Sequence, residues 1–253
     1  MYGNPLEWTA GTKAVLLLCF TLLLHTQYFL WAYYQVSNYA PALNQTYVNT
    51  QYINDNLVYL NSILLMTLGI LCLTVVLRKY YPNSEIHEHV ATQYFALTML
   101  MGGYAIGTLT MATGVVLAGA PVLGFILFNR RAVLGALIIS IICHSVVSAS
   151  SSLSIIPYAP VVERFQETDG ALSRFWLEAM YYFVTPHLIA ITVMAYHVLS
   201  RWRQRENEVR LLSLTDPLTL LSNRRSILSS LNQEYERSQR HGTSFSLLLV
   251  DLD

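Results

Sequence analysis

Residues 92–128 read TQYFALTMLMGGYAIGTLTMATGVVLAGAPVLGFILF, a run of 37 residues without a charged side chain. A helix of this length would measure about 55 Å, which is too long for one crossing of a bilayer and short for two. Basic pairs flank the run, Arg78-Lys79 before it and Arg130-Arg131 after it. Because basic residues beside apolar spans stay on the cytoplasmic side, we expect the run to cross outward, turn near Thr110–Gly114 and return.

The rest of the first 200 residues has the same apolar character. The 253-residue chain has 15 Lys and Arg and 15 Asp and Glu, and half of these 30 charges lie in residues 201–253. Soluble domains carry about 25% charged residues, so the first part is not an ordinary soluble fold and the second is not a membrane span. We predict an all-α membrane domain at residues 1–199, a bundle of six transmembrane helices at Ala14–Val36, Leu57–Leu77, Thr92–Thr110, Ala112–Phe128, Ala132–Ser152 and Trp176–Leu199.

Charge placement predicts the orientation of the bundle. The loops Ser37–Asn56 and Leu153–Phe175 carry only Arg164 and Arg174 as basic residues, whereas the segments expected on the other side carry eight: Lys13, Arg78, Lys79, Arg130, Arg131, Arg201, Arg203 and Arg205. Positive residues favour the cytoplasm, so both termini are expected there, with the two loops outside. His87-Glu88-His89 is then expected in a solvated cytoplasmic loop.

Three histidines are expected at one depth in the membrane. His25 lies 12 residues after a basic residue, His144 lies 13 after one, and His187 lies 14 before one. At 1.5 Å per residue, all three lie about 18–21 Å from the cytoplasmic edge. Ionisable groups inside a span are functional candidates by default.

Several ligands fit these histidines. Imidazole binds iron and copper, and two histidines on facing helices could ligate a b-type haem. Met180 and Met194 lie seven residues on either side of His187, on the same helix face, and thioethers ligate copper(I) and haem iron. A haem or copper sensor site, a polar pocket for a lipid, fatty acid or quinone, and simple hydrogen bonding between helices all remain open.

Residues 200–215 form a predicted linker after the last span. Good helix formers dominate this segment, which favours a signalling helix that continues out of the membrane. Its apolar residues recur at three, seven and three positions, a spacing that could also support a short two-stranded coil: Leu199, Trp202, Val209 and Leu212.

A different pattern follows Pro217, which ends the linker helix. Thr215 or Asp216 is placed to cap a new helix. Ser222–Arg240 is predicted as an amphipathic helix, and Ser244–Asp251 as a buried strand that ends in carboxylates. The expected buried side of the helix is Ile227, Leu228 and Leu231.

The tail resembles the opening of a GGDEF domain, the diguanylate cyclase family. Asp216-Pro-Leu-Thr219, Leu221 and Asn223-Arg224-Arg225 follow the pattern D-x-L-T-G-L-x-N-R-R, except that Leu220 stands where the family has Gly. Ser246–Asp253 then follows the family's D-x-D strand. The resemblance spans Leu212–Asp253, and it implies that residues 216–253 are the truncated start of an α/β, cyclase-like domain.

The resemblance also implies a chemistry. The family joins two GTP into cyclic di-GMP on two facing domains, so it implies GTP as substrate, a homodimer, and Mg²⁺ or Mn²⁺. Asp251 matches a metal-ligand carboxylate and the Leu252 carbonyl a backbone ligand, whereas Asp216, Asn223, Arg224 and Arg225 match structural positions at the start of the domain. The catalytic loop of the family is not in these residues, so the 253 residues alone are expected to be inactive.

The combined prediction is a sensor in the inner membrane of a bacterium, embedded in the lipid bilayer, that controls synthesis of cyclic di-GMP. The alternative is a membrane redox protein or sensor that binds haem or a metal and carries a degenerate GGDEF tail. No nucleic-acid partner is expected.

Overall fold

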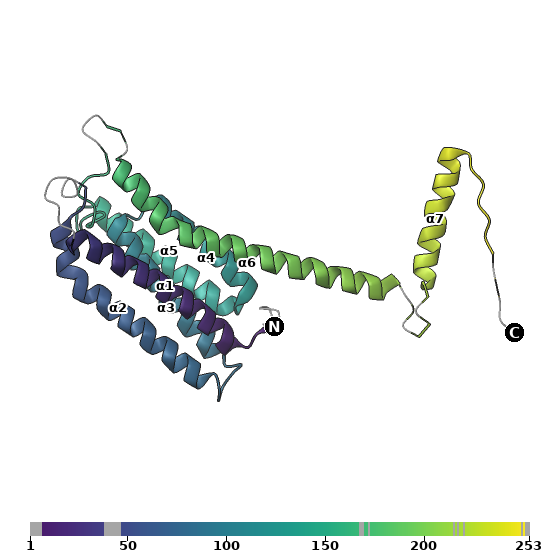
Figure 1. Ribbon diagram of the computed structural model, residues 1–253, viewed down its shortest axis with the longest axis horizontal. Coiled ribbons are helices and arrows are strands. Elements are labelled where there is room, and N and C mark those ends of the chain that lie inside the picture. Colours follow the sequence, from purple (N-terminus) through teal and green to yellow (C-terminus); the bar gives the residue numbers. More distant parts are fainter. Residues whose placement is uncertain are drawn as a thin grey trace. The chain divides into compact units, whose positions relative to one another are not determined.

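The computed structural model describes residues 7–37, 47–166, 170–171, 173–214, 216, 218–219, 221–248 and 250. The chain divides into two compact units, Met1–Val198 and Leu199–Asp253. Within the described residues, and apart from isolated β-bridges such as Val48–Val162, every regular element is a helix. The helices are α1 Ala10–Ser37, α2 Thr50–Leu77, α3 Glu85–Ile106, α4 Met111–Leu127, α5 Arg130–Ser152, α6 Arg174–Leu214 and α7 Arg224–His241 (Figure 1).

Four helices of the described chain are long and apolar enough to cross a membrane. They are α1, α2, α5 and the part of α6 at Arg174–Asn207. The apolar helix α4 has only 17 residues. α3 has 22 residues, and Glu85 and Glu88 lie in its first turn. These findings fit a membrane protein, but they do not confirm the predicted number of six spans.

The long uncharged run breaks into two helices, as predicted, but slightly earlier than predicted. α3 ends at Ile106 and α4 begins at Met111, whereas the turn was expected near Thr110–Gly114. Gly107 has φ +108°, a backbone conformation that side chains with a Cβ rarely adopt. A Cβ at this position would lie 2.8 Å from the hydroxyl of Tyr158. The break therefore depends on glycine and on a packing partner 51 residues away in the chain.

One end of the bundle, which we call the loop end, gathers the connections predicted to lie on the same side. Val48 forms the antiparallel bridge with Val162. The Val161 N–H donates to the Ala105 carbonyl at 3.0 Å, next to the break between α3 and α4. α2 begins at Thr50 rather than at Leu57, so the first of these loops is shorter than expected.

The opposite end, which we call the basic end, lies where the basic pairs follow α2 and begin α5. The backbone N–H of Asn129, just before Arg130, donates to the Glu88 carboxylate at 2.5 Å. The Gly11 N–H donates to the Pro82 carbonyl at 2.9 Å. His87-Glu88-His89 was expected in a solvated loop, and this prediction was wrong. The segment lies in the first turns of α3, with His87 and Glu88 buried, because Glu88 caps the start of α5.

The largest buried cluster lies at the loop end. Trp176 is 1% exposed, and its Nε1–H donates to the Tyr47 carbonyl at 3.2 Å. Its ring lies 6.4 Å from that of Trp31, which lies 5.1 Å from that of Phe183. This aromatic cluster ties α6 to α1 and to the segment before α2.

In the described residues, α6 approaches its neighbours less closely than the other membrane helices do. The backbone of α1 packs closely on α2 and α3, α3 on α4 and α5, and α4 on α5, but α6 has no comparable backbone approach to any of them. Its contacts are made by large side chains such as Trp176 and Phe183. Space consequently remains between α6 and the other helices.

The second unit contains the end of α6 and the predicted amphipathic helix. α7 runs from Arg224 to His241, two residues later at its start than predicted. No residue of α7 is buried: Ile227 and Leu228 are about half exposed and Leu231 is half-buried, so the expected buried side is not covered within the described residues.

The predicted strand Ser244–Asp251 is not formed in the described residues. Residues 243–248 and 250 follow α7 without regular structure, and Leu248 is 85% exposed. A strand is stable only when neighbouring strands satisfy its backbone hydrogen bonds, and no second strand lies beside it in the described part of the chain. The α/β character of the tail is therefore not confirmed.

Candidate functional site

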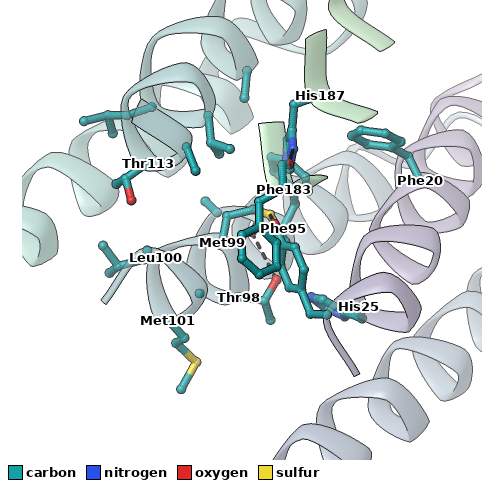
Figure 2. Close-up of a pocket in the computed structure, with 18 of the residues that line it drawn as sticks. Phe20, His25, Phe95, Thr98, Met99, Leu100, Met101, Thr113, Phe183 and His187 are labelled. Atoms are coloured by element: carbon teal, nitrogen blue, oxygen red, sulfur yellow. Dashed lines mark hydrogen bonds between the residues drawn. The ribbon is translucent and has the colours of Figure 1, made fainter. Parts of the chain in front are cut away.

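A cavity of about 1050 Å³ lies inside the first unit. It is comparable with the largest ligand pockets of proteins. Helices α1 to α6 all contribute to its wall, which is predominantly apolar and rich in aromatic rings. Figure 2 shows its lining, including Phe20, Phe95, Met99 and Phe183.

The three membrane histidines predicted at one depth all line this cavity. His25 comes from α1 and is 5% exposed, and His187 comes from α6 and is 4% exposed. His144, from α5, is half-buried. In Figure 2, His25 extends from the purple α1 and His187 from the green α6. Three positions spread over 163 residues of sequence thus meet at one site.

His25 is held by a buried polar network. Its Nδ1 lies 2.7 Å from the hydroxyl of Thr67 on α2. That hydroxyl lies 2.8 Å from the Tyr94 hydroxyl on α3 and 2.7 Å from the Ile63 carbonyl. The other ring nitrogen, Nε2, is buried and has no hydrogen-bond partner within the described part of the chain. One side of the ring is therefore fixed, while the other remains able to bind a ligand.

His187 is held by its own helix. Its Nδ1 lies 3.0 Å from the Phe183 carbonyl, one turn earlier in α6, and its Nε2 is buried with no hydrogen-bond partner in the residues that the structure describes. A carbonyl only accepts hydrogen bonds, so Nδ1 carries the proton and Nε2 of the neutral ring carries a lone pair. The Phe20 ring lies edge-on to the imidazole with centroids 5.9 Å apart.

Pro186 explains the local shape of α6. Proline has no N–H, so it leaves the Tyr182 carbonyl without its helical partner. Gln27 of α1 takes that place, since its Nε2 donates to the Tyr182 carbonyl at 2.6 Å. The Tyr182 hydroxyl donates back to the Gln27 carbonyl at 3.3 Å. This exchange fixes the height of α1 against α6 directly beside both histidines.

The two methionines predicted beside His187, Met180 and Met194, lie in different parts of the first unit. Met194 lines the cavity, as does Ser140, whereas Met180 packs on the aromatic cluster at the loop end. Across the described residues, no three or more His, Cys, Asp and Glu side chains gather closely enough to hold a metal ion. The predictions of haem or copper rest on the histidines alone and stay predictions.

The electrostatics of the cavity restrict what it can hold. Of the described residues that line it, none is Asp, Glu, Lys or Arg. An ion inside would be separated from water without a counter-ion, which costs several kcal/mol. The wall can therefore bind an apolar, neutral molecule and offer it two buried imidazole nitrogens.

Sequence reasoning missed the residues that hold the histidines in place. Thr67 and Tyr94 hydrogen bond around His25, and Phe20 packs on His187, yet threonine, tyrosine and phenylalanine are ordinary residues of membrane helices. A polar residue within a span was the available signal, and Thr67 is fully buried at such a position.

In the second unit, the predicted opening motif makes local hydrogen bonds. The Asp216 carboxylate accepts hydrogen bonds from the backbone N–H groups of Thr219 and Leu218 and from the Thr219 hydroxyl. These bonds, that of the Thr219 N–H foremost, lower the pKa of Asp216 below its usual value.

Asn223, rather than Thr215 or Asp216, caps α7. Its side-chain oxygen accepts from the Ser226 N–H at 3.0 Å. Arg224 and Arg225 are exposed in the first turn of α7. Asp251 and Leu252, the predicted metal ligands, lie outside the described residues.

A comparison with known protein families finds a match, and it lies in the second unit. Residues 213–253 match the family "Diguanylate cyclase, GGDEF domain". No curated protein and no solved structure matches the chain. The match and the apolar helices that precede it fit a membrane-bound GGDEF protein.

Proposed function

We propose that this chain, a membrane-bound GGDEF protein, is a sensor that controls the synthesis of cyclic di-GMP from two GTP. The observation that carries the proposal is the run of α6. This helix contributes Pro186, His187 and Met194 to the cavity and ends at Leu214, the second residue of the segment that matches the GGDEF family. One helix thus belongs both to a candidate ligand site and to the start of the output domain.

The proposed output chemistry follows from the family. A GGDEF cyclase uses two GTP on two facing domains, so the active form would be a homodimer. Asp251 and the Leu252 carbonyl would supply hard oxygen ligands of the kind that Mg²⁺ and Mn²⁺ prefer. The metal would neutralise phosphate charge during phosphoryl transfer.

The proposed location is the inner membrane of a bacterium, with the basic end of the bundle in the cytoplasm. The pairs Arg78-Lys79 and Arg130-Arg131 support this orientation, because the first follows α2 and the second begins α5 at that end. A cytoplasmic end of α6 would place the cyclase domain beside its GTP.

The proposed coupling works through a change in the position or rotation of α6. Because α6 approaches the other helices mainly through large side chains, a molecule bound in the cavity would form part of its packing. Filling or emptying the cavity would change the preferred position of α6, and so the way in which two cyclase domains face each other.

Helical register in α6 tests this coupling. Inserting one residue after Arg203, in the exposed part of α6, rotates everything that follows by about 100°. Inserting seven residues rotates it by only about 20°. We expect the one-residue insertion to change cyclic di-GMP output of the complete protein several-fold, and the seven-residue insertion to leave it closer to wild type.

Two controls make the result specific. Each variant must reach the membrane in equal amount, as judged by immunoblotting. Asp251→Asn in the complete protein should abolish output, which would show that the measured cyclic di-GMP comes from this protein. Equal output from the wild type and from both insertions would refute coupling through α6.

A further inference from the structure

We propose that the cavity binds a neutral, lipid-soluble hydroquinone, with one hydroxyl donating a hydrogen bond to Nε2 of His187. This inference specifies the ligand of the proposed sensor, but the binding itself does not depend on cyclase activity. Three observations carry it: the bonding of His187, the absence of charge among the described lining residues, and the rings around the imidazole.

The hydrogen bond of His187 determines whether a ligand at this ring must donate or accept a hydrogen bond. Nδ1 uses its proton toward the Phe183 carbonyl, so Nε2 is a buried acceptor that has no hydrogen-bond partner among the described residues. A buried acceptor without a donor costs about 1–3 kcal/mol. A ligand hydroxyl removes that cost, whereas a ligand carbonyl would bring a second lone pair against the first.

His25 provides a second polar position in the same wall. The Thr67 hydroxyl can accept a proton from His25 Nδ1 or donate one to it, because the Tyr94 hydroxyl can satisfy the Ile63 carbonyl instead, at 3.1 Å. His25 Nε2 can thus donate or accept. It would bind a hydroxyl or a carbonyl, so it adds affinity without distinguishing the two.

The lining favours a neutral ligand with a planar ring. A fatty-acid carboxylate or the two propionates of haem would find no Lys or Arg among the described lining residues. Aromatic side chains surround the histidines instead. Phe20 stacks near Phe95 with centroids 6.4 Å apart, and Phe183 packs edge-on against Tyr28 at 5.6 Å. Such rings pack well against another ring.

These features make the site sensitive to the oxidation state of its ligand. A hydroquinone has two hydroxyl groups, and the corresponding quinone has two carbonyls in the same places. Only the reduced form can donate to His187. The cavity would therefore be filled when the pool of such molecules in the membrane is reduced, and would empty as that pool is oxidised.

The test measures binding to the purified 253-residue chain in lipid nanodiscs. The probe is a benzoquinone with a decyl tail, titrated by calorimetry without oxygen in its oxidised and its reduced form. We expect the hydroquinone to bind about 10-fold more tightly, since one hydrogen bond distinguishes the two forms. Equal affinities, or no binding of either form, would overturn the proposal.

Matched variants locate the contact. His187→Phe should weaken hydroquinone binding about 10-fold and remove the preference between the two forms. His25→Phe should weaken both forms and keep the preference. His197→Phe, at an exposed position of α6 outside the cavity, should change neither. Circular dichroism and gel filtration verify that each variant is folded, and the preference of the wild type itself requires no variant.

The other occupants give distinct results. A Soret band in the purified wild type would show haem, and a fatty acid in its lipid extract would show a carboxylate ligand; either would overturn the proposal. Cyclic di-GMP output of the complete protein separates the two hypotheses. If hydroquinone binds but the cyclic di-GMP output does not change, only the sensor role is refuted. If the α6 insertions change the output but no hydroquinone binds, only the identity of the ligand is refuted.

Discussion

Thr67→Val tests whether the polar network around His25 is a stabilising element of the bundle. Thr67 is 0% exposed, and its hydroxyl lies within 2.8 Å of His25 Nδ1, the Ile63 carbonyl and the Tyr94 hydroxyl. Valine has the same shape but no hydroxyl. The Ile63 carbonyl keeps the Tyr94 hydroxyl as a partner, so the main loss is that His25 Nδ1 becomes buried and unbonded.

The expected magnitude follows from that single lost partner. A buried polar group left without a hydrogen bond costs about 1–3 kcal/mol in soluble proteins. In membrane proteins the measured values average about 0.6 and reach about 1.7 kcal/mol, because the unfolded chain also finds partners. Since the site is fully buried, we expect Thr67→Val to lower the free energy of unfolding by about 1.5 kcal/mol, roughly a 10-fold change in the folding equilibrium.

Thr74→Val is the matched control on the same helix. Thr74 is 6% exposed, and its hydroxyl donates to the Ile70 carbonyl of its own helix. That carbonyl keeps its helical partner, so we expect a loss below about 0.5 kcal/mol. Both variants would be unfolded reversibly in mixed micelles by titration with dodecyl sulfate and followed by circular dichroism. Losses that agree within about 0.3 kcal/mol would show that the His25 network contributes nothing specific.

Two further predictions concern the turns. Gly107→Ala should destabilise the bundle by about 1–3 kcal/mol, because φ is +108° and the new Cβ would meet the Tyr158 hydroxyl. Gly69→Ala is the control: its new Cβ meets nothing within 4 Å, so this variant should be neutral or stabilise α2 by up to about 1 kcal/mol. The same unfolding titration measures both variants, and a larger loss of stability for Gly69→Ala than for Gly107→Ala would contradict the reasoning. The Asp216 carboxyl should titrate below its counterpart in an unstructured peptide, because the Thr219 N–H bonds to the charged form. Since its pKa is lowered by folding, the turn keeps its full contribution at neutral pH and loses it only as the pH falls through the lowered value. Carboxyl NMR shifts against pH measure this, and a pKa equal to that of the peptide would refute it.

Local sequence was sufficient to predict most of the apolar helices, but not the contacts that these helices make with distant parts of the chain. Apolar runs and basic flanks predicted α1, α5 and the start of α6 within a few residues, because an apolar segment long enough to cross a bilayer is recognisable from composition alone. The break after Ile106 was harder to place, since several glycines occur nearby. The one that breaks the helix is Gly107, against which the Tyr158 hydroxyl packs, while the Val161 N–H from the same distant loop donates to the Ala105 carbonyl just before it.

Some features of the candidate site were likewise predictable from local sequence, and others were not. Residue counts predicted one common depth for His25, His144 and His187, and the structure shows that all three line one cavity. The sequence could not predict which methionine lines the cavity with them, because Met180 and Met194 share a helix face but lie at different heights along α6. The predicted strand fails for a related reason: its apolar pattern is local, but strand pairing requires neighbours that the described residues lack.

The aromatic cluster at the loop end has a consequence for how a molecule reaches the cavity. Trp31, Phe183 and Val161 belong both to that cluster and to the cavity wall, so a solute arriving from water on that side meets a packed barrier. Ile189 and Val193, by contrast, line the cavity and are about half exposed on the apolar flank of α6. Entry would therefore be lateral, from the bilayer. Occupancy would then follow the mole fraction of the ligand in lipid rather than its aqueous concentration, and apparent affinities would scale with the amount of lipid in the assay.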